Sequence, residues 1–166
     1  RLVENRRTDA VLWLIDRGAD TEATDQTGHR ALDYATAHGL TEVVARLSRS
    51  GSGGADSRDA EGNTPLHQAV YNDQAEVVRT LLAASKAQLN APNDAGETPL
   101  LVACGRGNLH IARMLLDAGA DANRPLTNGT TPLHWAAQAG NRFLVEALLG
   151  AGEAIDARNG VGETTL

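Results

Sequence analysis

The chain has 166 residues, of which 42% are hydrophobic, and a formal net charge of −6. This balance fits one folded domain with an apolar interior, and it argues against a nucleic-acid backbone as the main partner, because proteins that bind nucleic acid carry a basic surface. No apolar run approaches the roughly 18 residues of a membrane-spanning helix, and Cys104 is the single cysteine, which excludes an intrachain disulfide and a thiol-based zinc site.

Along the chain, short apolar helical patterns alternate with glycine-containing turns. The first pattern ends in LIDRGAD (14–20), and this ending recurs as LLDAGAD (115–121) and LLGAGEA (148–154), with a glycine where helices commonly stop. A second motif recurs as TPLH, TPLL, TPLH and TTL, which begin at Thr64, Thr98, Thr131 and Thr164 and are therefore 34, 33 and 33 residues apart. A glycine precedes each of these threonines, and the degenerate RALD that begins at Arg30, by two residues: Gly28, Gly62, Gly96, Gly129 and Gly162. Each repeat therefore predicts a turn, a short helix, a tight turn, a second helix and a glycine stop.

This period and motif closely resemble the ankyrin repeat, a unit of roughly 33 residues that carries T-P-L-H-x-A after a glycine-containing turn. The resemblance implies an all-α fold, an ankyrin-repeat solenoid of stacked helix-turn-helix units with projecting hairpin turns. It covers essentially the whole chain as a single ankyrin-repeat domain, divided as follows: a partial repeat (1–24), a degenerate repeat (25–58), three further repeats (59–92, 93–125 and 126–158) and the start of a truncated repeat (159–166). We expect SGSGG (50–54) to be a loop inside the degenerate repeat, and the chain to be part of a longer polypeptide.

The TPLH motif has a structural explanation. Thr64 is placed to cap a helix with its hydroxyl, and Pro65 suits the first helical position, where no amide proton is needed. His67 is expected to bond this threonine and the local backbone, and its recurrence as His134 favours that role over catalysis. We assign the same structural role to the matching threonines and prolines: Thr98, Pro99, Thr131 and Pro132.

The sequence contains no constellation of catalytic or ligating residues that stands apart from the repeat. His29, His38 and His110 lack the spacing of metal ligands, and Cys104 occupies a small core position. GVGET (160–164) lacks the third glycine and the preceding strand of a dinucleotide site. The sequence therefore predicts no catalytic residue, no metal, no cofactor and no enzyme activity of its own.

The predicted binding residues lie on the first helix of each repeat, beside the apolar stripe formed by Leu66, Ala69 and Val70. The ankyrin resemblance implies that this second stripe and the turn tips line a concave groove for partners. Tyrosine and tryptophan are enriched among interface hot spots, although such rings can instead pack against the neighbouring turn. The predicted partner-binding residues are Tyr34, His38, Gln68, Tyr71, Asn72, Arg106, Trp135 and Gln138 on the stripe, with Glu61, Asp94 and Glu97 at the tips.

We interpret the chain as a non-catalytic protein–protein interaction scaffold that binds a partner protein or peptide through this groove. Acidic tips around an aromatic floor predict a partner segment with basic and apolar residues, and the setting is expected to be intracellular, cytoplasmic or nuclear. Two alternatives stay open. The chain is a substrate-recruiting or regulatory segment of a larger enzyme whose catalytic domain lies outside it, or it is a structural spacer or assembly segment. The sequence does not indicate the oligomeric state.

Overall fold

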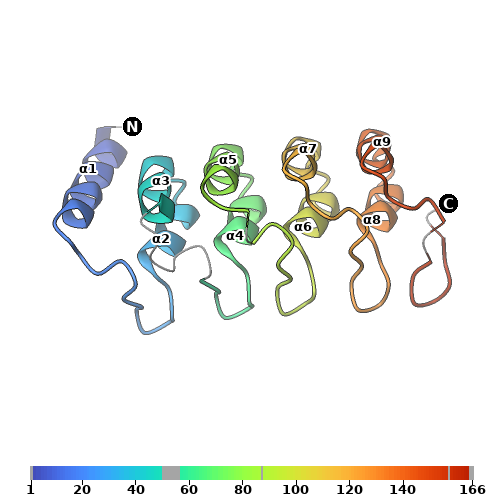
Figure 1. The fold of residues 1–166 in the computed structure, drawn as a ribbon, viewed down its shortest axis with the longest axis horizontal. Helices are drawn as coiled ribbons and strands as arrows, with labels where there is room; N and C mark the ends of the chain where they lie inside the picture. The colour runs from blue at the N-terminus through green and yellow to red at the C-terminus, as the bar shows by residue number, and fades with distance from the viewer. Residues whose placement is uncertain (1, 50–56, 87, 157, 165–166) are drawn as a thin grey trace. The chain divides into compact units, whose positions relative to one another are not determined.

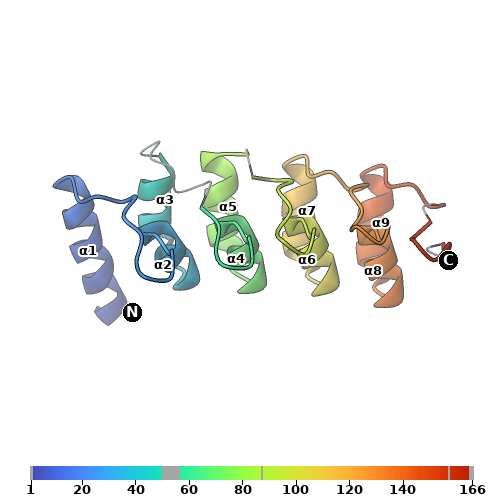
Figure 2. The same cartoon turned by 90° about the horizontal axis from the view of Figure 1, so that it is seen from below.

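The computed structural model describes residues 2–49, 57–86, 88–156 and 158–164 (Figures 1 and 2). Within these ranges the regular structure is helical, and the predicted all-α class is confirmed. The described residues form no strand, and one isolated bridge pairs Arg158 with Thr164. The predicted SGSGG loop lies outside the described residues. The helices are α1 (Leu2–Asp16), α2 (Ala31–Ala37), α3 (Thr41–Arg49), α4 (Pro65–Tyr71), α5 (Ala75–Ala84), α6 (Pro99–Gly105), α7 (Leu109–Asp117), α8 (Pro132–Gln138) and α9 (Arg142–Gly150).

The chain forms two compact units, Arg1–Gln88 and Leu89–Leu166, called unit 1 and unit 2 below. In unit 1, α2 packs on α3 and α4 packs on α5, while α2 also contacts α4 and α3 contacts both α1 and α5. In unit 2, α6 packs on α7 and α8 on α9, with α6 against α8 and α7 against α9. Each helical hairpin therefore stacks first helix on first helix and second helix on second helix, as Figure 1 shows within each unit.

The core of each unit is aliphatic. Ala69 in α4 and Ala103 in α6 are fully buried, and their small side chains let neighbouring helices approach closely. Burial of each leucine or isoleucine side chain in the second helices stabilises the fold by about 1.5–3 kcal/mol. The largest fully buried side chains include Leu32, Val43, Val44, Val70 and Val77 in unit 1, and Leu100, Ile111, Leu115, Leu133, Leu144 and Leu148 in unit 2.

The first helices begin with the residues of the repeated motif. Thr64 is the N-cap of α4, its Oγ1 lies 2.9 Å from His67 Nδ1, and its backbone N–H donates to the same nitrogen at 3.2 Å. Thr131 and His134 repeat this arrangement at the start of α8, with the same 2.9 Å separation. In all three TPL segments the proline is the first helical residue.

Two of the repeats replace the motif histidine by another residue. At α6, Thr98 Oγ1 accepts the Leu101 N–H at 3.2 Å, so that the threonine caps the helix without a histidine. At α2, Asp33 takes the place of the histidine and accepts the Arg30 N–H at 2.8 Å. The buried Asp33 also accepts from the Ser57 hydroxyl at 2.8 Å, which ties the degenerate motif to the start of the next turn.

The tight turn between the two helices of a repeat contains a residue in the left-handed region. Glycine occupies that position at Gly39, Gly107 and Gly140, with φ between 64° and 68°. The matching residue before α5 is Asp73, with φ 53°, the single non-glycine residue of positive φ in the described chain. Left-handed backbone is strained for a residue with a Cβ, so this turn is less favourable than its counterparts.

Two asparagines link successive repeats of unit 2. Asn90 Oδ1 accepts the Asp121 N–H at 2.9 Å, and Asn123 Oδ1 accepts the Ala154 N–H at 3.0 Å. The Asn123 amide also donates to the Gly152 carbonyl at 3.3 Å. These bonds give backbone groups outside the helices a partner where a repeat meets the next one.

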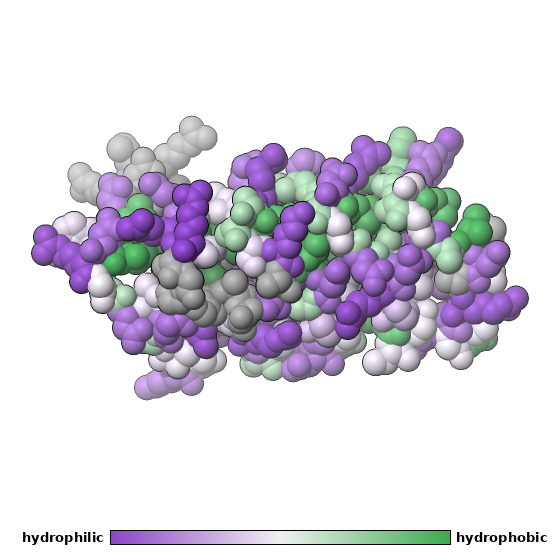
Figure 3. All heavy atoms as spheres, viewed as in Figure 1, coloured by the Kyte–Doolittle hydropathy of each residue, from purple (hydrophilic) through white to green (hydrophobic). Residues whose placement is uncertain are grey.

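The surface of both units is mixed. The face drawn in Figure 3 carries hydrophilic residues, with hydrophobic residues showing between them over the helices. The large apolar side chains exposed in the described chain are Trp13, Leu14, Tyr34, Phe143, Ile155 and Val161.

We expect Asp73→Gly to raise the free energy of unfolding by up to about 1 kcal/mol, because glycine adopts the left-handed conformation without steric strain. Urea unfolding followed by circular dichroism measures the change. Asp73→Ala is the matched control and should lower stability, since alanine keeps the Cβ and lacks the polar side chain. A destabilised glycine variant would show that the carboxylate of Asp73 outweighs the strain.

We expect His67→Ala to lower the free energy of unfolding by about 2–4 kcal/mol, because it leaves a cavity and takes a hydrogen-bond partner from the buried Thr64. The same urea titration measures this loss. Asn72→Ala, at the exposed position directly after the end of α4, should change stability by less than about 0.5 kcal/mol. A His67→Ala variant as stable as the Asn72→Ala variant would contradict a structural role for His67.

Candidate functional site

The tips of the hairpin turns share one hydrogen-bonded frame. Asp25 begins the first turn, and its Oδ1 accepts the N–H groups of Thr27 and His29 at 2.8 and 2.9 Å. Asp59 and Asn93 bind the second and fourth residues after them in the same way. In these three turns the side chain that opens the turn therefore holds the tip in one conformation, which is the physical reason for Asp or Asn there.

In unit 1 the tip is also bonded to the predicted stripe. The Tyr34 hydroxyl donates to Asp25 Oδ2 at 2.6 Å, and Tyr34 stays half exposed at 50%. At the matching position of the next repeat, the Gln68 amide donates to Asp59 Oδ2 at 3.2 Å. The structure thus brings two predicted binding residues, Tyr34 and Gln68, against the turn of their own repeat.

The hydrogen bonds change the acidity of these groups. The bond from Tyr34, followed by that from Thr27, holds the pKa of Asp25 far below its usual value, and the same bond raises the pKa of Tyr34. Burial acts to raise the pKa of Asp59, but bonds from Asn63, Gln68 and the Glu61 backbone outweigh it and leave the pKa lowered. Both carboxylates are charged and fully engaged within the turn at neutral pH.

The other predicted residues of unit 1 differ in exposure. His38, Asn72 and Glu61 are exposed, and their side chains make no hydrogen bond or ion pair within the described residues. Tyr71 is half-buried and takes part in an interaction within the chain. His29 lies beside Tyr34, with the ring centres 5.9 Å apart. His29 is not among the partner-binding residues predicted from the sequence.

In unit 2 the stripe is built around Trp135. The half-buried indole lies against Gly105 of α6, where an added Cβ would stand 4.0 Å from ring atoms Cδ2 and Cε3. Arg106 and Gln138 are exposed and have no side-chain partner in the described chain. Val102, at the position of Tyr34 and Gln68, is buried instead.

The two predicted carboxylates at the first tip of unit 2 have different surroundings. Asp94 is exposed and forms no ion pair with any described residue. Glu97 is half-buried, and its Oε2 accepts from the Asn93 amide at 3.0 Å. Asp94 is therefore available to a partner, whereas Glu97 helps to hold the turn.

Sequence reasoning missed the buried carboxylate of Glu153. This residue is 5% exposed, and its Oε1 accepts the Leu133 N–H in the first turn of α8 at 3.0 Å. Burial raises the pKa of Glu153 although bonds from Thr131 and Leu133 act to lower it. A signal was present in LLGAGEA, because the matching residue of the preceding repeat is Ala120.

Cys104 is inert in this environment. It is fully buried in α6, and burial, with a smaller contribution from the charge of Glu153, raises the pKa of the thiol to about 12. A buried thiol of such low acidity is a poor nucleophile at neutral pH.

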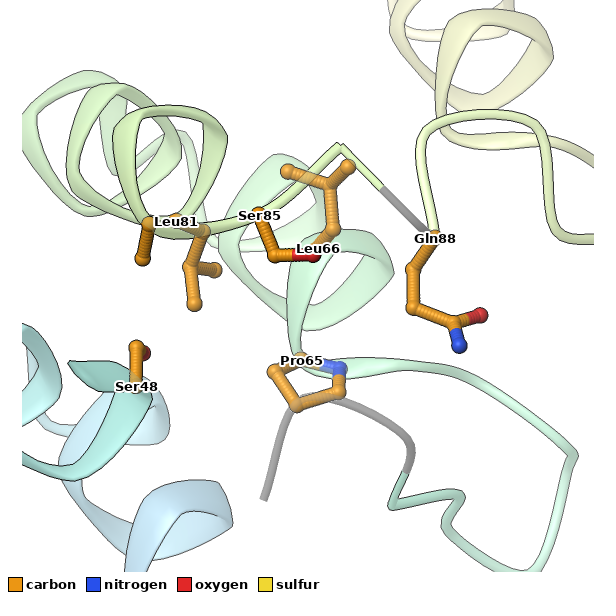
Figure 4. A pocket seen from close by; sticks show the side chains of 7 residues that line it. Ser48, Pro65, Leu66, Leu81, Ser85 and Gln88 are labelled. Atoms are coloured by element: carbon orange, nitrogen blue, oxygen red, sulfur yellow. The ribbon is translucent and has the colours of Figure 1, made fainter. Parts of the chain in front are cut away.

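Two hollows adjoin these elements. A small apolar one of about 20 Å³ lies in unit 1 between the end of α3, the start of α4 and the end of α5, where Leu66, Leu81 and Ser48 form its walls (Figure 4). A polar one of about 470 Å³ lies in unit 2 beside α8, with His134 and Gln138 facing Asn159 and Glu163. His134 Nε2 lies 3.3 Å from the Glu163 carbonyl, so the histidine is committed to the fold at both ring nitrogens.

The described residues contain no group of three or more His, Cys, Asp and Glu side chains that could hold a metal ion. No helix among them is both long and apolar enough to cross a bilayer.

Comparison with known proteins identifies the class. The sequence profile described as ankyrin repeats (3 copies) matches residues 1–93 and 83–159. The chain therefore belongs to the ankyrin-repeat family, as its sequence motifs predict. Ankyrin repeats are typically modules that bind other proteins, and the family is generally non-catalytic.

Its relatives are longer proteins. The ankyrin repeat protein nuc-2 of Neurospora crassa is 31% identical over 106 residues, which is 64% of this chain and 10% of that protein. The Neurogenic locus Notch protein of Drosophila melanogaster is 34% identical over 119 residues, 71% of this chain and 4% of that protein. The 26S proteasome non-ATPase regulatory subunit 10 of Dictyostelium discoideum is 35% identical over 90 residues, 54% of this chain and 38% of that protein. The chain thus spans well under half the length of each.

We expect Tyr34→Phe to raise the pKa of Asp25 toward its usual value, because the variant removes the strongest donor to the carboxylate. Carboxyl-carbon NMR during an acid titration reads this pKa directly. Tyr71→Phe is the matched control and should leave Asp25 unchanged. An unaltered Asp25 in Tyr34→Phe would mean that the tyrosine does not engage the turn in solution.

Proposed function

We propose that this chain is a non-catalytic scaffold that binds a segment of another protein through the first helices and hairpin tips. The observation that carries the proposal is Tyr34, which is half exposed yet held by the 2.6 Å bond to Asp25. A ring already fixed in one orientation loses little conformational entropy on binding, which is what an interface anchor requires. Gln68, fixed to Asp59 in the same way, extends this surface to the next repeat.

The contribution that we propose for unit 2 centres on Trp135. Its ring lies against Gly105, where the absence of a side chain leaves an aromatic face for a partner. Arg106 and Gln138, which have no side-chain partner among the described residues, offer polar contacts. We keep His38, Tyr71 and Asn72 as further contact residues, and we propose that these surfaces belong to the concave groove implied by the family resemblance. We propose the same repeat boundaries as those predicted from the period of the sequence.

The partner that we propose is a segment with basic and apolar residues. Glu61 and Asp94 supply exposed carboxylates without a partner in the described chain, whereas Asp25 and Asp59 are already occupied. Glu97 contributes mainly by holding its turn. Because attraction between exposed charges is screened by salt, association should slow as the ionic strength rises.

A second candidate is a regulatory or recruiting segment of a larger enzyme. One relative of this chain is named a non-ATPase regulatory subunit of the 26S proteasome, so ankyrin repeats of similar sequence occur within an enzyme assembly. The two candidates share the binding surface and differ in what the partner is. Identification of the bound protein separates them.

We expect a Tyr34→Ala, Trp135→Ala double variant to lose a partner that the unaltered chain captures from native lysate. Loss of a hot-spot aromatic side chain costs about 2 kcal/mol or more of binding free energy, so surface plasmon resonance with the recovered partner should show a decrease in affinity of roughly 30-fold or more.

Trp13→Ala is the matched control, because Trp13 is an exposed aromatic residue of α1 outside this surface. It should keep full affinity, and circular dichroism should show that all variants are folded. Equal capture by the double variant would contradict the proposed surface and favour a spacer or assembly segment.

A further inference from the structure

A hollow recurs between consecutive second helices. It lies between α1 and α3 and between α3 and α5 in unit 1, and between α7 and α9 in unit 2, with volumes of about 280, 220 and 310 Å³. The repeat places matching backbone positions around each hollow, so their differences arise from the side chains. These hollows are on the second helices and share no residue with the surface proposed above for the first helices.

The hollow between α3 and α5 is lined by two arginines and by no acidic residue. Arg49 stands on one side and Arg79 on the other, and both are exposed. Between them the floor is made of small side chains and one hydroxyl group: Ala45, Thr80, Ala83 and Ala84. In a chain of net charge −6, this is a local concentration of positive charge over an apolar floor.

The two matching hollows have balanced charges. Between α1 and α3, Asp16 binds Arg46 at 2.5 Å, and the lining also includes Glu42 and Arg49, which is shared with the α3–α5 hollow, so that two carboxylates stand beside two guanidinium groups. Between α7 and α9, Arg113 is offset by Asp117, which occupies the position of Arg49. The position of Arg79 is taken there by Glu146, which is itself paired with Arg142 at 2.7 Å.

The arginines of the α3–α5 hollow are weakly engaged by the protein itself. Arg49 forms no hydrogen bond or ion pair with any described residue. Arg79 contacts Glu76 at 3.4 Å, but the two side chains are 61% and 73% exposed, and such surface pairs contribute little. The Thr80 hydroxyl donates to the Glu76 carbonyl of its own helix, so the arginines are the donors available to a ligand.

We propose that the hollow between α3 and α5 is a second docking site, which takes an acidic segment of a protein partner. A glutamate or aspartate of that segment lies between Arg49 and Arg79, where a guanidinium group matches a carboxylate with paired hydrogen bonds. An apolar neighbour of the acid rests on the alanine floor. The charge preference is opposite to that of the first-helix surface, so the two sites select different segments.

The test uses the full chain, labelled with ¹⁵N, and two synthetic peptides at low salt. The acidic probe is acetyl-Leu-Glu-Glu-Leu-Glu-Glu-Leu-amide, and its counterpart has glutamine in place of every glutamate. We expect the acidic peptide to shift the Nε–H signals of Arg49 and Arg79 and the amides of residues 45–49 and 79–84. The glutamine peptide should leave them unchanged.

Charge reversal in the hollow should weaken this binding. We expect Arg49→Glu with Arg79→Glu to lower the affinity for the acidic peptide by roughly tenfold or more. The same double variant should gain affinity for a lysine version of the peptide, and circular dichroism should show that it is folded. Arg113→Glu with Arg142→Glu makes the same change of net charge on the second helices of unit 2, and it should leave binding of the acidic peptide within about twofold of the unaltered chain.

The following results would overturn the proposal. They are equal shifts with the glutamine peptide, equal loss of affinity in the control double variant, and the absence of acidic-peptide shifts at Arg49 and Arg79 in the unaltered chain. Shifts of the Tyr34 or Trp135 signals by the acidic peptide would place its binding on the first helices instead, and would count against the proposal as well.

Discussion

The structure depends on the fact that its first helices are too short to be stable alone. Each has seven residues, below the roughly 12–15 at which an isolated helix begins to hold in water. Two things compensate. In α4, α6 and α8 a threonine cap with a proline at the first position sets the start of the helix. Burial of an aliphatic stripe against the neighbouring repeat supplies the free energy that each helix lacks. Fully buried alanines such as Ala69 and Ala103 keep those neighbours close.

The same constraint explains why the candidate surface is rigid. The hairpin tips that open with Asp25, Asp59 or Asn93 are held by that side chain. In unit 1 the side chains of Tyr34 and Gln68 also connect helix to tip. Residues that would bind a partner are thus part of the bonds that keep the repeat in shape. The residues around the second helices have a different character, because those helices are held by core packing, and their outer charges vary from one repeat to the next.

The repeated pattern predicts much of the fold. Whether a single side chain is exposed or bonded depends instead on the groups that lie next to it. The threonine cap and the start of α4 at Pro65 agree with local rules of helix formation, which do not depend on distant residues. By contrast, Glu97 is bonded to Asn93 while Asp94 stays exposed, a distinction that requires the conformation of the turn. Trp135 lies against Gly105, a residue 30 positions earlier, and the contact exists because the repeats stack.

By itself the sequence determined the repeat period, the all-α class, the helix starts and the family, because these depend on local propensity and on a pattern that occurs several times. Tertiary structure alone decided the surroundings of the residues that depart from the repeat pattern. The buried Glu153 beneath α8 and the bond of Ser57 to Asp33 each depend on groups brought together from different turns. The acidity of Asp25 and the cationic hollow of Arg49 and Arg79 likewise arise from distances between side chains, which a linear pattern does not contain.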